Sequence, residues 1–152
     1  MTFKAKRATR SFRQSINADA KTVHGLICPV KEAEWLDGWD YEMIYSESGL
    51  AEEGCVFTSH QPGEPDTIWM ITRRDDTEKV TEFCRITPGI KTARLVVAIQ
   101  DTNTNCARVD ITYTFTALSE EGNRFVDAFT EENFVADMKS WEATMNHFLE
   151  TG

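Results

Sequence analysis

The feature that most constrains the fold is an amphipathic segment from Thr130 to Glu150. Thr130 is a good N-cap residue, and the two acidic residues that follow it suit the positive end of a helix macrodipole. At about 100° per residue the large apolar side chains fall on one stripe of the predicted helix. These are Phe134, Met138, Trp141, Met145 and Phe148. A helix of this length spans about 30 Å, so a wide apolar surface must cover the stripe.

The middle of the chain alternates apolar and polar residues with a period of two, which is typical of strands with one buried face. The predicted strands are residues 41–46, 55–60, 67–73, 79–87, 92–100 and 108–117. Short polar or Pro-Gly turns separate them. Strands with such short connections pair as an antiparallel meander.

The N-terminal part indicates one more strand, over residues 9–16, followed by two short helices. Asn17 and Asp19 are cap candidates for the first helix, and Cys28-Pro29 separates it from the second, over residues 31–35. Trp35 and Trp39 flank an Asp-Gly turn, where we expect them to plug one end of the core or to form a rim that gates a ligand. A short helix within residues 119–129 precedes the last one. This order predicts one α+β domain over residues 1–152.

The composition argues against several classes of function. A net charge of -9 and a pI of about 4.8 oppose a nucleic-acid surface. The sequence has no signal-peptide pattern and no run of 18 apolar residues, which predicts a cytoplasmic protein without stable membrane insertion. The four cysteines form no C-x-x-C pair and suit a reducing compartment. An oligomer is compatible with these features.

Motifs for metal or cofactor chemistry are absent from the sequence. His24, His60 and His147 have none of the spacings typical of metal ligands. The chain also lacks a G-x-S-x-G elbow, a phosphate-binding glycine loop and a dinucleotide fingerprint. We therefore expect neither a metal nor a cofactor.

The order of elements resembles the helix-grip fold of the START and birch-pollen-allergen superfamily, which also contains polyketide cyclases, chaperone activators and lipid-transfer domains. Two segments, CPVKEAEW at residues 28–35 and TALSEEGN at residues 116–123, resemble signatures of a bacterial subgroup that point to relatives without indicating an activity. The glycine-rich loop of the plant allergens is replaced here by residues 48–54. The resemblance implies a seven-stranded antiparallel sheet that curves around the C-terminal helix and leaves a cavity between them.

Residues expected to line this cavity come from both surfaces: Trp69, Phe83, Arg94 and Tyr113 from the strands, and Phe134, Met138, Trp141 and Met145 from the helix. For two strands, residues 67–73 and 79–87, alternation does not decide which of the two faces lies inward. Trp69 shares a face with Ile71 and Arg73, and Phe83 shares one with Arg85, opposite Glu82. Arg94 is either a surface cation paired with an acid on a neighbouring strand or a group that captures a ligand carboxylate.

Three functions fit these features. The favoured one is binding of a hydrophobic or amphipathic small molecule, such as a lipid, an isoprenoid or an aromatic metabolite, without catalysis. The second is an enzyme of the polyketide cyclase or dehydratase kind, which would need a convergent pair of polar groups in one pocket, for example Tyr113 with His60 or Glu82. The third is an interaction module like the chaperone activators, with a filled core and an exposed apolar patch.

Overall fold

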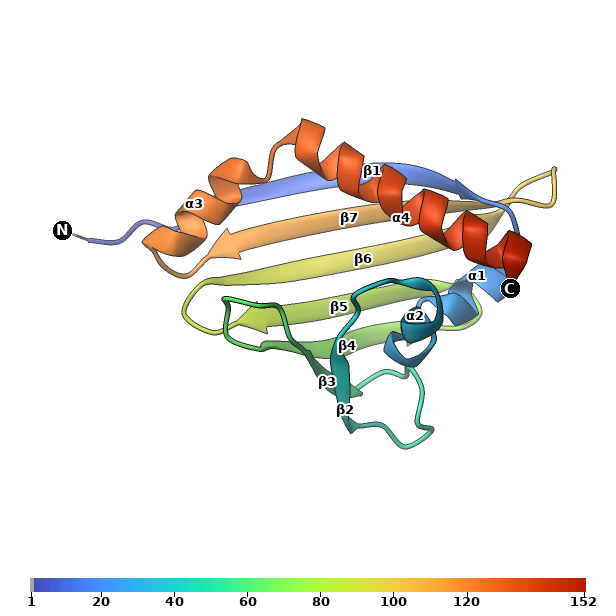
Figure 1. Ribbon diagram of the computed structural model, residues 1–152, viewed down its shortest axis with the longest axis horizontal. Helices are drawn as coiled ribbons and strands as arrows, with labels where there is room; N and C mark the ends of the chain where they lie inside the picture. Colours follow the sequence, from blue (N-terminus) through green and yellow to red (C-terminus); the bar gives the residue numbers. More distant parts are fainter. Residues whose placement is uncertain (1) are drawn as a thin grey trace.

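The computed structural model describes residues 2–152, which form a seven-stranded antiparallel sheet and four helices (Figure 1). The strands are β1 (Arg7–Ile16), β2 (Tyr41–Tyr45), β3 (Val56–Ser59), β4 (Thr67–Asp75), β5 (Val80–Thr87), β6 (Lys91–Asp101) and β7 (Ala107–Ala117). The helices are α1 (Ala20–Leu26), α2 (Pro29–Trp35), α3 (Glu120–Ala128) and α4 (Glu131–Thr151). The predicted α+β class and the order of elements are confirmed.

The strands from β2 to β7 pair in chain order, and β1 adds to the far side of β7. Each of these pairs is antiparallel, as the short connections predict. Helix α4 crosses one face of this sheet, and α1 and α2 lie near its C-terminal end (Figure 1). We call the face toward α2 and α4 the inner face, and the opposite one the outer face.

Helix α4 has the cap and the buried stripe that its sequence predicts. The Thr130 side chain accepts a hydrogen bond from the backbone N–H of Asn133, 3.2 Å away. Phe134, Met138 and Met145 are buried against the sheet. Gln14 on β1 donates a hydrogen bond from Nε2 to the carbonyl oxygen of Met138, at 2.9 Å. The helix is therefore attached to the sheet by a polar contact as well as by its apolar stripe.

A β-bulge in β4 changes which side chains face inward. The pairing with β5 shifts between Ile71 and Arg73, so alternation skips one residue there. Trp69 and Ile71 are buried on the inner face, whereas the Arg73 side chain is 53% exposed and that of Arg74 only 9%. The prediction that Arg73 shares the face of Trp69 is wrong because of this bulge. No helix within residues 2–152 combines the length and the hydropathy of a membrane span.

Candidate functional site

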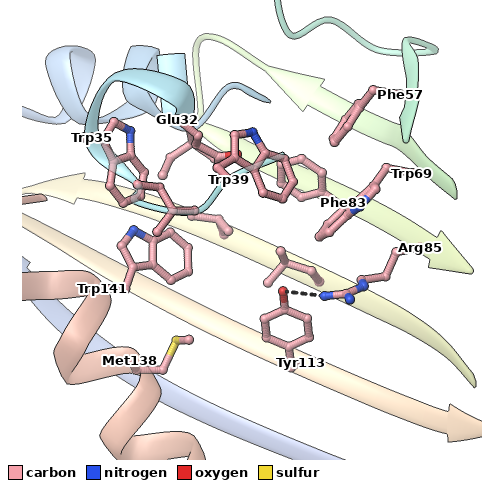
Figure 2. A pocket seen from close by; sticks show the side chains of 14 residues that line it. Glu32, Trp35, Trp39, Phe57, Trp69, Phe83, Arg85, Tyr113, Met138 and Trp141 are labelled. Atoms are coloured by element: carbon pink, nitrogen blue, oxygen red, sulfur yellow. Dashed lines mark hydrogen bonds between the residues drawn. The ribbon is translucent and has the colours of Figure 1, made fainter. Parts of the chain in front are cut away.

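A cavity of about 200 Å³ lies between the inner face of the sheet and helices α2 and α4 (Figure 2). We call it the first chamber. Half of the residues that line it are aromatic: Trp35, Trp39, Phe57, Trp69, Phe83, Tyr113 and Trp141. The chain has four tryptophans, and all of them belong to this set. The cavity wall is therefore mostly flat, apolar ring surface.

Trp69 is the centre of an aromatic cluster on the sheet side of the first chamber. Its ring stacks on Phe57 at a centroid distance of 5.5 Å and meets Phe83 edge-on at 5.8 Å. Trp39 meets it edge-on at 6.0 Å. The indole Nε1 of Trp69 donates a hydrogen bond to Ser59 Oγ at 2.8 Å. These contacts stabilise the ring positions and satisfy the polar atom of Trp69.

On the helix side, Trp35 from α2 stacks on Trp141 from α4 with ring centroids 6.0 Å apart. Trp35 Nε1 donates to the carbonyl oxygen of Leu26, and Trp39 Nε1 donates to that of Pro29. Trp141 Nε1 is shielded from solvent and has no hydrogen-bond partner within the described residues. Trp141 therefore has an unsatisfied donor that is shielded from solvent.

Arg85 is the cation of the first chamber. Its Cζ lies 4.5 Å from the centroid of the Trp69 ring and 5.7 Å from that of Phe115. Nη1 lies 3.5 Å from the hydroxyl oxygen of Tyr113, the upper limit for a hydrogen bond (Figure 2). Nε is shielded from solvent and has no partner, and Arg85 forms no ion pair with any residue in the described part of the chain.

Glu32 is the acid of the first chamber. It comes from the first turn of α2 and lies beside Trp39, on a different side of the cavity from Arg85 (Figure 2). Burial of its carboxyl group raises its pKa to about 8, although the positive charge of Arg74 acts in the opposite direction. At neutral pH most of this group is protonated, so it can donate a hydrogen bond or a proton.

A second chamber of about 240 Å³ adjoins the first. Both are lined by Arg85, Tyr113 and Met138, which therefore separate them. The remaining wall of the second chamber is formed by Gln61, Glu64, Lys91, Phe115, Phe125, Phe129, Phe134 and Asp137. Lys91 Nζ forms an ion pair with Glu64 at 3.0 Å and lies 4.1 Å from the centroid of the Phe125 ring. The cation of the second chamber thus has a carboxylate partner, unlike Arg85.

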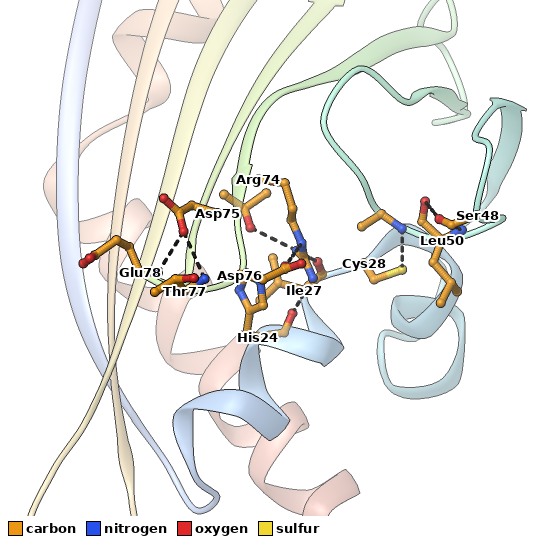
Figure 3. Close-up of polar contacts among 12 residues, drawn as sticks. His24, Ile27, Cys28, Ser48, Leu50, Arg74, Asp75, Asp76, Thr77 and Glu78 are labelled. Carbon is orange, nitrogen blue, oxygen red and sulfur yellow. Dashed lines mark hydrogen bonds and ion pairs between the residues drawn. The ribbon is translucent and has the colours of Figure 1, made fainter.

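Arg74, the other inward arginine, holds α1 in place (Figure 3). Its Nη1 donates to the carbonyl oxygen of Ile27 at 2.6 Å and to Thr81 Oγ1 at 3.0 Å. Its Nη2 donates to the carbonyl oxygen of His24 at 2.9 Å, and its Nε lies 3.7 Å from Asp76. These contacts satisfy carbonyl groups at the C-terminal end of α1. Arg74 is therefore structural and contributes no free donor to either chamber.

Most residues expected at the cavity lie there. Trp69, Phe83, Tyr113, Met138 and Trp141 line the first chamber, and Phe134 lines the second together with Tyr113 and Met138. Met145 is in the hydrophobic core and lines neither chamber.

The prediction that Arg94 faces the cavity is wrong. It alternates with the inward Leu95, and its side chain is 65% exposed on the outer face. There Nη2 binds Glu82 Oε2 at 2.6 Å, which is the surface ion pair weighed as the alternative. This hydrogen bond, opposed by partial burial and aided by Thr72, lowers the pKa of Glu82.

The catalytic pair considered for Tyr113 does not form. His60 is on the loop after β3, where Nδ1 lies 3.0 Å from Asp66, and it lines neither chamber. Glu82 is on the outer face with Arg94. Tyr113 instead shares the first chamber with Glu32 and the second chamber with Glu64 and Asp137.

Glu32 was not among the residues expected at the cavity, and the sequence did not decide whether Arg85 faces inward. Glu32, Trp35 and Leu36 are spaced i, i+3, i+4, which is a signal for one helix face. Arg85 shared a face with Phe83 in the strand pattern, and the structure shows that this face is the inner one. Trp35 and Trp39, expected either in the core or at a rim, line the first chamber. Within residues 2–152, no group of three or more His, Cys, Asp or Glu side chains is arranged to hold a metal ion.

Comparisons with known proteins agree with this architecture. No protein-family model matches the sequence, and a search of curated proteins found no match. Among solved structures, truncated norcoclaurine synthase from Thalictrum flavum matches with a TM-score of 0.69 at 13% identity, over 100% of this chain and 99% of that one. Zhui aromatase/cyclase from Streptomyces sp. R1128 matches with a TM-score of 0.67 at 14% identity, over 96% of each chain. Ara h 8.0201 matches with a TM-score of 0.67 at 10% identity, over 97% of this chain and all of that one. Since these proteins share the arrangement of sheet and long helix described above, the chain has the helix-grip fold of the START and birch-pollen-allergen superfamily.

Proposed function

We propose that this protein is a cytoplasmic binding protein for a small hydrophobic or amphipathic molecule, which it encloses between the sheet and α4. The observation that carries this proposal is the aromatic first chamber of about 200 Å³. Pockets for drug-sized ligands measure about 300–1,000 Å³. The first chamber alone therefore suits a compound of one or two rings, and a longer ligand would extend past Arg85 into the second chamber.

Burial of apolar surface supplies the binding free energy. Each buried CH₂ contributes about 0.8 kcal/mol, and the flat walls favour a planar ligand that stacks on or meets the indole rings. Three polar groups in the first chamber are available to orient it: the Arg85 guanidinium, the Tyr113 hydroxyl and the Glu32 carboxyl. An apolar pocket with a few converging polar groups is the usual composition of a small-molecule site.

Native mass spectrometry of freshly purified protein tests the proposal. We expect an added mass, and its removal with organic solvent should lower the melting temperature because a ligand that binds only the folded state stabilises it. Since all four tryptophans line the first chamber, rebinding should change the intrinsic fluorescence. Protein that is always empty and binds no hydrophobic compound would contradict the proposal.

A pair of variants shows whether the ligand occupies the first chamber. Val97→Phe places a larger side chain in its wall and should abolish the fluorescence response. Ile68→Phe adds a phenyl ring to the outer face, where Ile68 is exposed, and should leave binding unchanged. Equal binding by the two variants would place the ligand elsewhere.

Glu32 favours acid–base catalysis as the second candidate function, in an enzyme of the polyketide cyclase or dehydratase kind. A carboxyl group with a pKa of about 8 exchanges protons near neutral pH, and it shares the chamber with Tyr113. Two proteins with this fold are named as a synthase and an aromatase/cyclase. On any substrate found to turn over, Glu32→Gln should lower kcat strongly, while Glu34→Gln on the exposed side of α2 should not. The third hypothesis, an interaction module, requires a filled core, and the two chambers give it no support.

A further inference from the structure

Arg85 differs from the other inward cations, Arg74 and Lys91, in its position and in its lack of a carboxylate partner among the described residues. It lies at the boundary of the two chambers, with its guanidinium between the rings of Trp69 and Phe115. A guanidinium carries five N–H donors in a fixed plane. Of these, one makes a contact at 3.5 Å to Tyr113, and Nε makes none while shielded from solvent. Arg85 is thus a half-buried cation whose hydrogen-bonding capacity is largely unused.

The carboxyl groups around the chambers do not neutralise Arg85. Glu64 is engaged by Lys91 at 3.0 Å, and Asp137, which lines the second chamber together with Arg85, forms no ion pair with it among the described residues. In the first chamber Glu32 is the only acid of the lining within the described residues, and its raised pKa keeps it mostly uncharged at pH 7. The first chamber therefore carries a net positive charge at neutral pH, whereas the second chamber pairs its lysine internally.

An unpaired donor that is shielded from water lowers stability, and a charged one does so more strongly. Arg74 shows how this chain satisfies an inward arginine when its role is structural, with three hydrogen bonds and a nearby Asp76. Arg85 lacks such partners and faces an accessible cavity instead. An anionic group on a ligand would supply the missing acceptors, since an arginine fork matches the two oxygens of a carboxylate.

From these contacts we propose that Arg85 selects a ligand with one anionic group, specifically a small planar carboxylate whose ring system lies among Trp39, Trp69 and Trp141. The carboxylate contacts the guanidinium, and the neutral Glu32 carboxyl donates to an acceptor on the far side of the ring. This inference rests on the proposed binding function and specifies its ligand class. The net charge of -9 does not oppose it, because exposed charges are screened over about 8 Å at physiological salt.

Two isosteric probes test this inference: 2-naphthoate, which is anionic, and 2-naphthamide, which is neutral. Binding is measured by isothermal titration and by quenching of the tryptophan fluorescence at pH 7. We expect wild-type protein to bind the naphthoate roughly 10- to 100-fold more tightly, as hydrogen bonds to charged groups imply. Arg85→Gln should reduce this ratio to about 1 by weakening naphthoate binding alone. Arg94→Gln, a matched change on the outer face of the neighbouring strand, should leave the ratio unchanged.

The outcomes separate the two proposals. Equal affinity of wild-type protein for the two probes, or equal loss of both in Arg85→Gln, would overturn the role of Arg85 while leaving a binding cavity intact. If neither probe binds and native mass spectrometry finds no ligand, the binding function itself fails. If Arg85→Gln unfolds below the temperature of the assay, Arg85→Lys replaces it as the test variant. It keeps the positive charge, so it should still bind naphthoate more tightly than naphthamide; equal affinities would overturn the inference.

Discussion

The raised pKa of Glu32 makes the stability of this protein depend on pH in a defined direction. Below about pH 4.5 the carboxyl is protonated in both the folded and the unfolded chain. Between that value and about 8 the unfolded chain releases the proton while the folded chain retains it. The free energy of unfolding therefore decreases as pH rises through this window, and Glu32 causes no further change above it.

The magnitude follows from the size of the pKa shift. One pKa unit corresponds to about 1.4 kcal/mol, so a shift from 4.5 to about 8 sets an upper bound of about 5 kcal/mol. Glu32 is half-buried, and water reaching its carboxyl reduces this value. We expect about 2–4 kcal/mol to be lost between pH 5 and pH 9.

The assay compares urea unfolding of wild-type protein and Glu32→Gln at pH 5, 7 and 9. Glutamine keeps the shape of the protonated acid and cannot ionise, so the variant should match wild type at pH 5 and exceed its stability at pH 9. Because both proteins share all other titrating groups, the difference between them isolates Glu32. Glu34→Gln, on the same helix with a side chain 55% exposed, is the control and should follow wild type. A difference between wild type and Glu32→Gln that is constant with pH would refute the reasoning.

Two further changes test the packing around the chambers. Gly122→Ala would place a Cβ onto the carbonyl oxygen of Ile90, where α3 meets the start of β6, and should lower the free energy of unfolding by about 1–3 kcal/mol. Gly25→Ala in α1 has open space around the new Cβ and should be neutral or slightly stabilising. Equal effects of the two substitutions on thermal unfolding would contradict the close approach at Gly122. Glu64→Gln leaves the Lys91 ammonium, whose side chain is 4% exposed, without its carboxylate and should destabilise the protein by about 1–3 kcal/mol. Adding Lys91→Met removes the unpaired charge and should restore much of that loss in a double-mutant cycle; an unrestored double variant would show that the ion pair is not the cause.

The periodic spacing of apolar residues predicted the helices and strands of this fold because that spacing depends on which residues are buried together. The stripe from Phe134 to Met145 needed a wide apolar partner, and the alternation of Val109, Ile111 and Tyr113 supplied one. Both follow from the 3.6-residue and two-residue periods of helix and strand. Turn residues between strands also predicted the antiparallel order, since short connections permit no other pairing.

Alternation alone did not identify which polar groups reach the cavity. A strand pattern divides residues between two faces without naming the inner one, so Arg94 was placed in the cavity and Glu82 was considered for it, although both are on the outer face. One bulge after Ile71 exchanged the roles of Arg73 and Arg74. Such a register shift depends on pairing with β5, which a single strand sequence does not encode.

By itself, the sequence determined the class of fold, the meander and the long helix that covers it, because these depend on periodic burial and on local caps and turns. The tertiary structure alone decided the chemistry of the cavity. It brought Glu32 from α2 into the wall of the cavity, where burial raises its pKa, and left Arg85 on β5 beside Trp69 without a carboxylate. Solvation and ion pairing depend on groups that are distant in the chain and adjacent in space, so the charge state of this site appears only when the sheet, α2 and α4 have assembled.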